Sequence, residues 1–563
     1  MGGTMIINGR PVAFTDEKNV LAVIHKAGID MPTLCYYSEL STYGACRMCV
    51  VEDSKGRINS SCSMEPADGL EIRTNTAKLL RYRQMIIELL LAAHDCNCTI
   101  CGKSGSCRLQ MLAHHYGVRR VRFTDTRERL PEDTSSYSVV RNPNKCILCG
   151  DCVRVCSEIQ GMGILDFVHR GSEARVRPAF DEDLINTKCI SCGQCAAVCP
   201  TNAIRIKRHI ADVWAAIFDP KKRVVAQIAP AVRVALGERF GLEPGANSVG
   251  KIVSALRAMG FDHVADTTLG ADFTVMEEAA EFMDRLKNGG TFPMYTSCCP
   301  AWVKYCENSD PELLEHLSTC RSPMSMFSPV IKKYYEQMEN DGRETINVAI
   351  MPCTAKKMEA ARKEFTRDGV PETNYVLTTQ ELVEMINESG LSFDSLEDYA
   401  PDMPLGLGSG AGVIFGATGG VAEAVVRRCV NDNKQYLSSQ KIELTAVRGF
   451  DSVKEAALTI DGTEIKLAVV HGLRNAQKLI ASVRAGECFY HLIEVMACPG
   501  GCVGGAGQPY GLTGVKKERA QGLYTADKMS GIRSSDENPI ITYLYDQVVK
   551  DQAHEMLHVH YHA

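Results

Sequence analysis

Two hydrophobic patterns divide the chain. Near the N-terminus, residues 4–14 and 49–53 alternate apolar and polar side chains, which is typical of short, half-buried strands. From about Val213 onward, short apolar runs such as 223–232 alternate with segments of helical periodicity such as 248–261. The sequence therefore predicts a multidomain α+β and α/β protein, with a largely parallel sheet in its C-terminal part.

Several cysteines follow strand-like runs in this C-terminal part. Cys353 ends the run "INVAIMPC", Cys498 ends "FYHLIEVMAC", and Cys299 follows "FPMYTSC". Because sites in open α/β sheets gather beyond the carboxyl ends of the strands, we expect these cysteines to lie near one another. With Cys502 they offer four ligands from three loops, and the glycines around Cys502 would let the backbone approach an inorganic group closely.

Composition and charge exclude some classes of function. The 563 residues are 45 % hydrophobic and 23 % charged, and the net charge is −6. This acidic balance argues against a general nucleic-acid-binding protein. The longest apolar stretch, at 85–93, is too short to span a bilayer and contains Glu88. The first residues lack a basic segment followed by an apolar core, so we predict a cytoplasmic protein.

Cysteine usage indicates metal binding. The chain has 25 cysteines, and 16 of them lie between Cys35 and Cys199. Cytosolic thiols stay reduced, so disulfides explain this poorly. The first group, Cys35, Cys46, Cys49 and Cys62, could hold one [2Fe–2S] cluster in a ferredoxin-like fold. Its spacing departs from the plant-type pattern, and a structural zinc site would use the same ligands.

A second group follows a helix predicted at 81–94. His94, Cys98, Cys101 and Cys107 offer one imidazole and three thiolates. This set suits a zinc ion as well as an iron–sulfur cluster, and the residues alone leave both readings open.

The third group has the most specific spacing. The stretches "CILCGDCVRVC" and "CISCGQCAAVCP" are two copies of the bacterial ferredoxin run C-x₂-C-x₂-C-x₃-C. In that arrangement three cysteines of one run bind a cluster together with the fourth cysteine of the other run. One [4Fe–4S] cluster would take Cys146, Cys149, Cys152 and Cys199. The other would take Cys156, Cys189, Cys192 and Cys195.

Three C-terminal stretches closely resemble the signatures of [FeFe]-hydrogenases: "TSCCPAW" at 296–302, "MPCTAKKMEA" at 351–360 and "EVMACPGGCVGGAGQP" at 494–509. The N-terminal cysteine pattern resembles that of clostridial-type monomeric enzymes with four accessory clusters. The resemblance covers essentially the whole chain. It implies a [2Fe–2S] domain at 1–78, a His/Cys₃ [4Fe–4S] domain at 79–125, a two-[4Fe–4S] domain at 126–209 and an H-cluster domain at 210–563.

The resemblance also implies the composition of the site. The [4Fe–4S] part of an H-cluster would be held by Cys299, Cys353, Cys498 and Cys502. Cys502 would bridge to a two-iron unit that carries CO, cyanide and azadithiolate. Lys356 would hydrogen-bond a cyanide. The remaining residues expected around the two-iron unit are Met351, Met496, Pro230 and Phe415.

A proton route is implied next to this site. In the resembling family the position of Cys298 exchanges protons with the two-iron unit. Glu278, Glu281 and Arg285 are spaced i, i+3, i+7, which places them on one helix face, and a solvated, salt-bridged face is the alternative reading. By resemblance the route runs through Cys298, Glu278, Ser318, Glu281 and Arg285 to water.

Some residues depart from the family pattern. Ala301 and Ala506 stand where glycine is common, and Met324 where glutamine is frequent. None of them is an expected ligand or proton carrier. We expect Glu277 to face away from the relay and to be structural.

We therefore expect a ferredoxin hydrogenase that interconverts protons and H₂. Its partners would be a ferredoxin or flavodoxin, docking near the cluster domains with the basic stretch 119–123 as one candidate surface, and maturation proteins for the two-iron unit. The alternatives are a subunit of an NAD(H)-linked complex, an H₂ sensor, and an electron-transfer arm that would share only the N-terminal cluster motifs.

Overall fold

The computed structural model describes residues 2–125, 127–339, 341–431, 445–460, 462–509 and 514–562. The chain forms two compact units. The first contains residues 1–187 and 194–205, and the second contains 188–193 and 206–563. Among the described residues, no helix combines the length and the apolar character needed to cross a bilayer.

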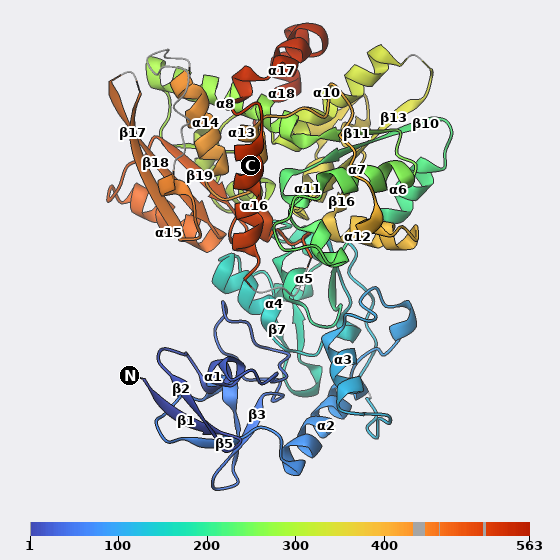
Figure 1. Ribbon diagram of the computed structural model, residues 1–563, viewed down its shortest axis with the longest axis vertical. Helices are drawn as coiled ribbons and strands as arrows, with labels where there is room; N and C mark the ends of the chain where they lie inside the picture. The colour runs from blue at the N-terminus through green and yellow to red at the C-terminus, as the bar shows by residue number, and fades with distance from the viewer. Residues whose placement is uncertain are drawn as a thin grey trace. The chain divides into compact units, whose positions relative to one another are not determined.

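The first unit begins with a five-stranded sheet in the order β2-β1-β5-β3-β4 (Figure 1). Its strands are β1 (Gly3–Ile7), β2 (Arg10–Phe14), β3 (Val50–Asp53), β4 (Ile58–Ser60) and β5 (Glu71–Arg73). The alternating stretch at 4–14 forms the β1–β2 hairpin, whose turn residues Asn8 and Gly9 both have positive φ. Two such residues are what a tight hairpin turn requires. Helix α1 (Val20–Lys26) adds its buried face to the core of this sheet.

Helices and short strands joined by loops make up the rest of the first unit. Helix α2 (Ala77–Ala92) is capped by Thr76, whose hydroxyl oxygen accepts a hydrogen bond from the Leu79 N–H. It starts before the predicted helix at 81–94 and ends two residues before His94. The elements that follow are α3 (Arg108–His115), β6 (Val139–Arg141), α4 (Asp151–Arg154), β7 (Asp166–Val168), β8 (Arg175–Arg177), α5 (Gln194–Val198) and β9 (Ile204–Ile206).

The two ferredoxin-type runs share a backbone conformation. Leu148 and Gly150 have positive φ in the first run, and Ser191 and Gly193 have positive φ at the equivalent positions of the second. A left-handed residue costs free energy unless it is glycine, so its recurrence at matching positions indicates a common constraint. The internal repeat in the sequence is thus a repeat in conformation.

The second unit contains two four-stranded sheets. One has the order β11-β10-β13-β16 and is entirely parallel. The other has the order β12-β19-β18-β17, in which only the edge strand β17 is antiparallel. The strands are β10 (Lys222–Ile228), β11 (His263–Asp266), β12 (Met294–Tyr295), β13 (Glu344–Met351), β16 (Tyr375–Thr378), β17 (Val453–Ile460), β18 (Thr463–His471) and β19 (Leu492–Met496). The predicted α/β architecture is confirmed.

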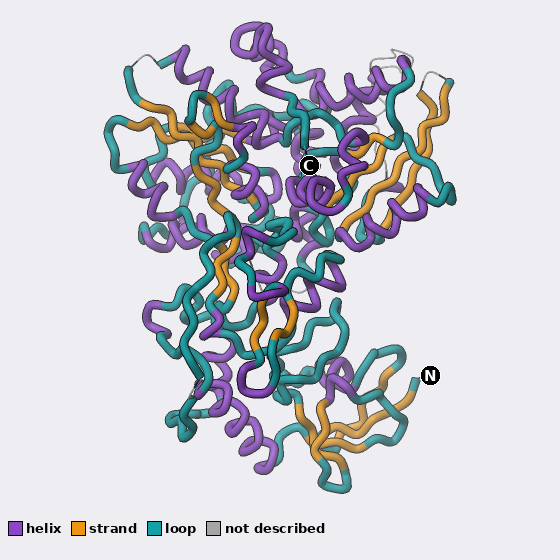
Figure 2. The backbone as a smooth tube through the Cα atoms, turned by 180° about the vertical axis from the view of Figure 1, so that it is seen from behind, coloured by secondary structure: helices purple, strands orange, loops and turns teal. Residues whose placement is uncertain are grey.

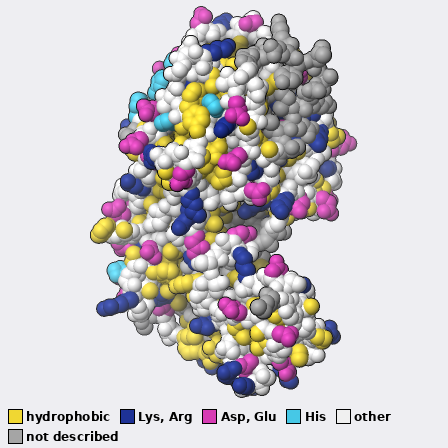
Figure 3. All heavy atoms as spheres, turned by 90° about the vertical axis from the view of Figure 1, so that its left-hand side faces the viewer, with side chains coloured by type: hydrophobic (Ala, Val, Ile, Leu, Met, Phe, Trp, Pro, Cys, Tyr) yellow, Lys and Arg dark blue, Asp and Glu magenta, His cyan; other side chains and the backbone are white. Residues whose placement is uncertain are grey.

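Helices pack against both sheets of this unit, and β17 and β18 lie at its outer edge (Figure 1 and Figure 2). Figure 1 shows α13 (Gly410–Ile414) and α16 (Lys516–Met529) between the two sheets. The other helices of the unit are α6 (Ile210–Ile217), α7 (Val249–Ala258), α8 (Thr267–Asn288), α9 (Pro300–Ser309), α10 (Pro323–Met338), α11 (Ala355–Ala360), α12 (Thr379–Glu388), α14 (Gly420–Asn431), α15 (Leu473–Arg484), α17 (Pro539–Leu544) and α18 (Ala553–Leu557). On the face seen in Figure 3, acidic and basic side chains are interspersed.

Helix α8 is the central helix of the second unit and carries the predicted proton carriers. Asp266 caps its first turn by accepting a hydrogen bond from the Thr268 N–H, and Gly289, with a φ of +79°, ends it. It packs against α10, α13 and α14. The contact with α13 is close because a Cβ on Gly412 would lie only 2.3 Å from the Thr268 carbonyl oxygen.

Candidate active site and iron–sulfur sites

The four predicted cluster ligands of the second unit lie in three loops, each directly after a parallel strand. Cys299 follows β12 and is the N-cap residue of α9. Cys353 lies between β13 and α11, and Cys498 and Cys502 follow β19. Because β12 and β19 are parallel neighbours, their carboxyl ends bring Cys299 and Cys498 to the same edge of the sheet.

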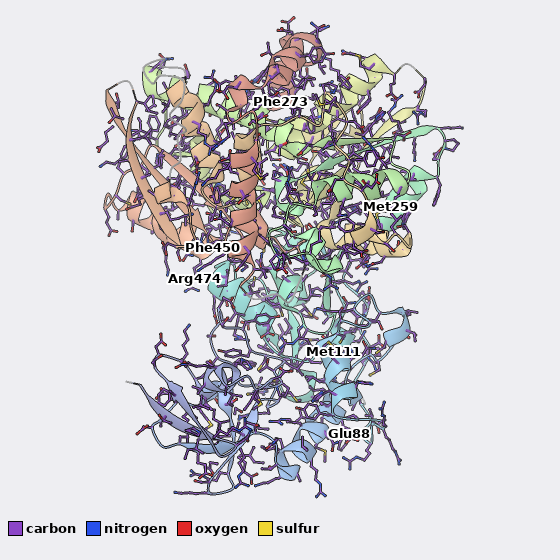
Figure 4. The ribbon with its side chains drawn as sticks, viewed as in Figure 1. Glu88, Met111, Met259, Phe273, Phe450 and Arg474 are labelled. Atoms are coloured by element: carbon purple, nitrogen blue, oxygen red, sulfur yellow. The ribbon has the colours of Figure 1, made fainter. Side chains whose placement is uncertain are left out.

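Glycines allow the loop after β19 to pack without side chains. Gly500 and Gly501 both have a φ of +84°, which favours glycine. A Cβ on Gly501 would lie 2.7 Å from the Thr418 backbone nitrogen. A Cβ on Gly500 would lie 2.6 Å from the ring of Phe450, which Figure 4 labels. The backbone at Cys502 is therefore held in one position.

The ligand thiols are close enough to influence one another. Burial raises the pKa of Cys353 to about 11, and the nearby Cys299 adds to the shift. Burial also raises the pKa of Cys502, with contributions from Cys353 and Cys299, while the Lys356 ammonium opposes it. Buried thiolates need a bound cation, and soft sulfur ligands suit iron–sulfur clusters. The donor set therefore fits the cluster that the sequence implies.

Lys356 is held beside the cysteine loops by an acidic partner. Its Nζ lies 2.7 Å from a carboxylate oxygen of Glu359 and donates to the Cys298 carbonyl oxygen at 3.5 Å. Burial lowers the pKa of Lys356, but the Glu359 carboxylate outweighs burial and raises it, so the ammonium stays charged. Glu359 did not emerge from the sequence, although its i, i+3 spacing from Lys356 could have indicated it.

The predicted lining residues fall into two neighbouring parts of the core. Met496 and Phe415 belong to the same hydrophobic cluster as Cys298, Cys299 and Cys502. Met351 belongs to a second cluster, which also contains Met324. Three further residues named from the sequence are all buried: Pro230, Ala301 and Ala506.

Three of the predicted proton carriers form a hydrogen-bonded row. Ser318 donates its hydroxyl hydrogen to Oε2 of Glu281 at 2.9 Å. Arg285 donates to Oε1 of the same carboxylate at 2.6 Å, and its guanidinium also donates to the Leu317 carbonyl. The Glu281 and Arg285 side chains keep 15 % and 12 % exposure, so this end of the row reaches the surface.

The inner end of the row is buried and electrically coupled to Cys298. Glu278 is fully buried, and burial together with the charge of Glu281 raises its pKa to about 8. Burial raises the pKa of Cys298, and Glu278 and Glu494 raise it further. Glu494, absent from the sequence prediction, binds the Gly419 and Ala422 backbone N–H groups at 2.6 and 2.9 Å. Both Glu278 and Cys298 are thus protonated at neutral pH.

The first cysteine group of the N-terminal unit forms two thiol pairs. A hydrogen bond from Cys35 lowers the pKa of Cys46 to about 7, and one from Cys62 lowers the pKa of Cys49 to about 6. The Cys46 backbone N–H also donates to the Cys35 sulfur at 3.4 Å. Thiolates therefore form readily at Cys46 and Cys49, and thiolates are the metal-binding form.

His94 has a nitrogen positioned for a ligand. The residue is buried, and its Nδ1 has no hydrogen-bond partner among the described residues. An imidazole nitrogen without a partner in a buried position is suited to metal binding. Of the associated cysteines, Cys107 is buried, Cys98 is half-buried, and the sulfur of Cys101 accepts from the Asn202 amide at 3.5 Å.

One of the two ferredoxin-type ligand sets surrounds a single cavity. Cys146, Cys149, Cys152 and Cys199 all line it. The Leu148 N–H donates to the Cys146 sulfur at 3.4 Å. In the other set, the residues fall in different units: Cys156 and Cys195 in the first, Cys189 and Cys192 in the second.

Across the described ranges, no three His, Cys, Asp or Glu side chains are grouped as a single metal ion would require. This finding concerns a single ion. A cubane cluster binds its four thiolates through separate iron atoms.

Models of known protein families match most of the chain. "Iron only hydrogenase large subunit, C-terminal domain" matches residues 222–506, and "Iron hydrogenase small subunit" matches 513–563. In the first unit, a 2Fe-2S iron-sulfur cluster binding domain matches 4–77 and the NADH-ubiquinone oxidoreductase-G iron-sulfur binding region matches 83–122. A 4Fe-4S dicluster domain matches 145–203.

Whole proteins of the same kind are similar over nearly the full length. The NADP-reducing hydrogenase subunit HndD of Solidesulfovibrio fructosivorans is 41 % identical over 99 % of this chain and 98 % of its own. Iron hydrogenase 1 of Clostridium pasteurianum is 36 % identical over 99 % of both chains. A solved [FeFe]-hydrogenase structure from Chlamydomonas reinhardtii has a TM-score of 0.56 and 37 % identity, covering 63 % of this chain and 99 % of its own. The chain therefore belongs to the iron-only, or [FeFe]-, hydrogenase family of oxidoreductases that act on H₂.

Proposed function

We propose that the protein catalyses the reversible reduction of protons to H₂, with electrons from a ferredoxin or flavodoxin. The observation that carries this proposal is the row formed by Arg285, Glu281 and Ser318, which runs along α8 toward the buried Glu278 and Cys298. A merely solvated, salt-bridged helix face would not extend, as this row does, to the fully buried hydroxyl group of Ser318.

The cofactor would be held by thiolates of the three loops. Cys299, Cys353, Cys498 and Cys502 would bind the [4Fe–4S] cluster, and Cys502 would bridge it to a two-iron unit with CO, cyanide and azadithiolate ligands. When bound, this group supplies the iron at which the H–H bond is made or broken. Lys356, which Glu359 keeps charged, would hydrogen-bond a cyanide ligand of this group.

The protein side chains move protons between water and Cys298. Glu281 takes a proton at the surface while Arg285 orients its carboxylate. Glu281 passes this proton to Ser318, and the Ser318 hydroxyl passes its own proton inward to Glu278. Glu278, with a pKa of about 8, can both hold and release a proton near neutral pH. Cys298 donates its own proton into the site, and its thiolate then takes the proton that Glu278 releases, which leaves Glu278 free to accept the next proton from Ser318.

The first unit would carry the electrons. Together with Cys189 and Cys192 of the second unit, its cysteine groups suit one [2Fe–2S] and three [4Fe–4S] accessory clusters, with His94 as one ligand. The basic stretch at 119–123 is at the surface: Arg119 and Arg120 are exposed, and Arg122 pairs with Glu88. An acidic electron carrier could dock there.

A second candidate function has support from one relative. A protein named as a subunit of an NADP-reducing hydrogenase is 41 % identical to this chain. By analogy this chain could be the hydrogen-activating subunit of a complex linked to a pyridine nucleotide. Purification from the native cells decides between the two: a bound flavoprotein subunit supports the complex, and a chain that turns over with ferredoxin alone supports the first proposal.

The test of the primary proposal combines two measurements on the anaerobic, matured protein. Infrared spectra should show CO and cyanide bands, and reduced ferredoxin should drive H₂ evolution. Bands without turnover would favour an H₂-sensing role. Absence of both would remove the proposal.

A further inference from the structure

The C-terminal segment after α18 is fixed beside the loop that carries Ser318. The Val559 N–H donates to the Thr319 carbonyl at 2.8 Å, and the Arg321 N–H donates to the Leu557 carbonyl at 2.9 Å. Cys320 and His558 form the antiparallel bridge between these two segments. The pairing places the His558 side chain directly next to the proton row.

Hydrogen bonds connect His558 to Glu281 through one hydroxyl group. Thr319 Oγ1 lies 2.9 Å from His558 Nδ1 and 3.2 Å from Glu281 Oε2. The Thr319 backbone N–H also donates to Glu281 Oε2, at 2.9 Å, which fixes the position of the threonine. A continuous path of polar atoms therefore leads from the imidazole to the same carboxylate oxygen that accepts from Ser318.

An acidic residue holds the other side of the imidazole. His558 Nε2 lies 3.0 Å from Glu277 Oε2, and the Tyr545 hydroxyl donates to Glu277 Oε1. The Tyr545 ring packs edge-on against Phe273 of α8, a residue labelled in Figure 4. Burial alone would raise the pKa of Glu277, but the bonds from His558 and Tyr545 outweigh it and lower the pKa. Glu277 is thus an anion that accepts the hydrogen bond from His558 and fixes the orientation of its ring.

The path also reaches the surface. The His558 side chain is 14 % exposed, as much as the side chain of Arg285 at 12 %. The charged and titratable groups that face His558 are Glu277 from α8, Tyr545 after α17, His554 of α18 in a stacked ring contact, and Arg321, which donates to the His558 carbonyl. Within the described residues, the imidazole nitrogens form hydrogen bonds with Glu277 and with the Thr319 hydroxyl group.

We propose that His558 and Thr319 form a second proton entry to Glu281, parallel to the entry at Arg285. The inference rests on the proposed hydrogenase function. Protonated His558 gives its Nδ1 proton to the Thr319 oxygen, and the Thr319 hydroxyl gives its own proton to Glu281 Oε2. His558 is left neutral and takes a new proton from water, while Glu277 remains an anion and orients the ring. Histidine is the side chain whose charge changes most readily near neutral pH.

The test uses the matured full-length enzyme with reduced ferredoxin and compares single and double variants. Arg285→Gln and His558→Gln should each lower H₂ evolution by less than about tenfold, because the other entry remains. The double variant should lose roughly 10²-fold, the scale of a lost proton-transfer group. A double variant no slower than Arg285→Gln alone would overturn the proposal. His491→Gln, at a histidine whose Nδ1 accepts from the Lys466 N–H far from the proton row in sequence, is the matched control.

A second variant and a second readout separate proton transfer from a structural role. Thr319→Val keeps the shape of the side chain and replaces the hydroxyl by a methyl group. The double variant of Thr319→Val and Arg285→Gln should therefore lose as much H₂ evolution as the double variant of His558→Gln and Arg285→Gln. As a second readout, replacing His558 by Gln in the Arg285→Gln enzyme should change the dependence of H₂ evolution on pH, because the remaining entry contains the imidazole. An unchanged pH profile contradicts the second proton entry.

Two results distinguish failure of the second proton entry from failure of the proposed hydrogenase function. A wild-type protein without infrared bands or H₂ evolution removes the proposed function. An active wild type whose double variants match Arg285→Gln removes only the His558 entry.

Discussion

Ser318 donates its hydroxyl hydrogen to Glu281 at 2.9 Å, across 37 residues of sequence. This bond joins a loop to α8 and links the surface pair of Glu281 and Arg285 to the fully buried Ser318. Ser318→Ala should therefore lower H₂ evolution by about 10²-fold while the infrared bands stay unchanged. Ser309→Ala, at the exposed end of α9, is the control. Full activity in Ser318→Ala would contradict the relay.

Glu278 makes stability depend on pH. Its pKa rises from the ordinary 4.5 to about 8 in the folded chain because the carboxyl is buried. Between these values the folded protein keeps a proton that the unfolded chain has lost, so stability falls as pH rises from about 4.5 to 8 and then levels off.

Glu278→Gln removes this titration. The free energy of unfolding of the variant relative to wild type should therefore increase from pH 5 to pH 8, measured by urea unfolding of the protein without the two-iron unit. A constant difference across this range would show that Glu278 is ionised in the folded state. The variant should also lose turnover, because glutamine carries no transferable proton.

The ion pair of Lys356 and Glu359 should contribute to the free energy of unfolding of the protein as well as keeping Lys356 charged. Both side chains are buried and 2.7 Å apart. Removing one partner leaves the other charge buried and unpaired, which costs about 3–5 kcal/mol. Lys356→Met should therefore destabilise the protein by roughly this amount. Lys356→Met combined with Glu359→Gln should recover part of it, as thermal unfolding of the two variants can show. Equal stability of both would mean that the charges do not interact.

The fold class could be predicted because it depends on local pattern. Alternating apolar runs gave the parallel strands, and the cysteines that follow β12, β13 and β19 lie in loops at their carboxyl ends. The i, i+3, i+7 spacing placed the carriers on one helix, as α8 shows.

The missed residues depend on long-range contacts. Thr319 and His558 are 239 residues apart in sequence, so no periodicity links them. Glu494 lies within the apolar run of β19, where the sequence shows no partner for it. Its carboxylate accepts hydrogen bonds from two backbone N–H groups at the start of α14, far away in the sequence. The expectation that Glu277 is structural did not foresee its bond to His558.

His94 should bind iron of a [4Fe–4S] cluster together with Cys98, Cys101 and Cys107, and not a zinc ion. Its free buried Nδ1 is available for iron. His94→Cys replaces a neutral ligand by an anionic thiolate, which should keep the cluster and lower its reduction potential, because added negative charge disfavours the reduced form. A redox titration followed by electron paramagnetic resonance measures this. Cys96→Ser, at an exposed thiol, should leave the signal unchanged. Zinc bound at this group in place of iron would contradict the assignment.

The central claim is that four thiolates from three loops bind one cluster while Cys298 stays free for protons. An anomalous difference map at the iron edge, from an anaerobic crystal of the matured protein, tests it most directly. The account predicts iron bonded to the sulfurs of Cys299, Cys353, Cys498 and Cys502, with the Cys298 sulfur unbonded. Iron bonded to Cys298, or any of the four sulfurs out of bonding reach, would contradict it.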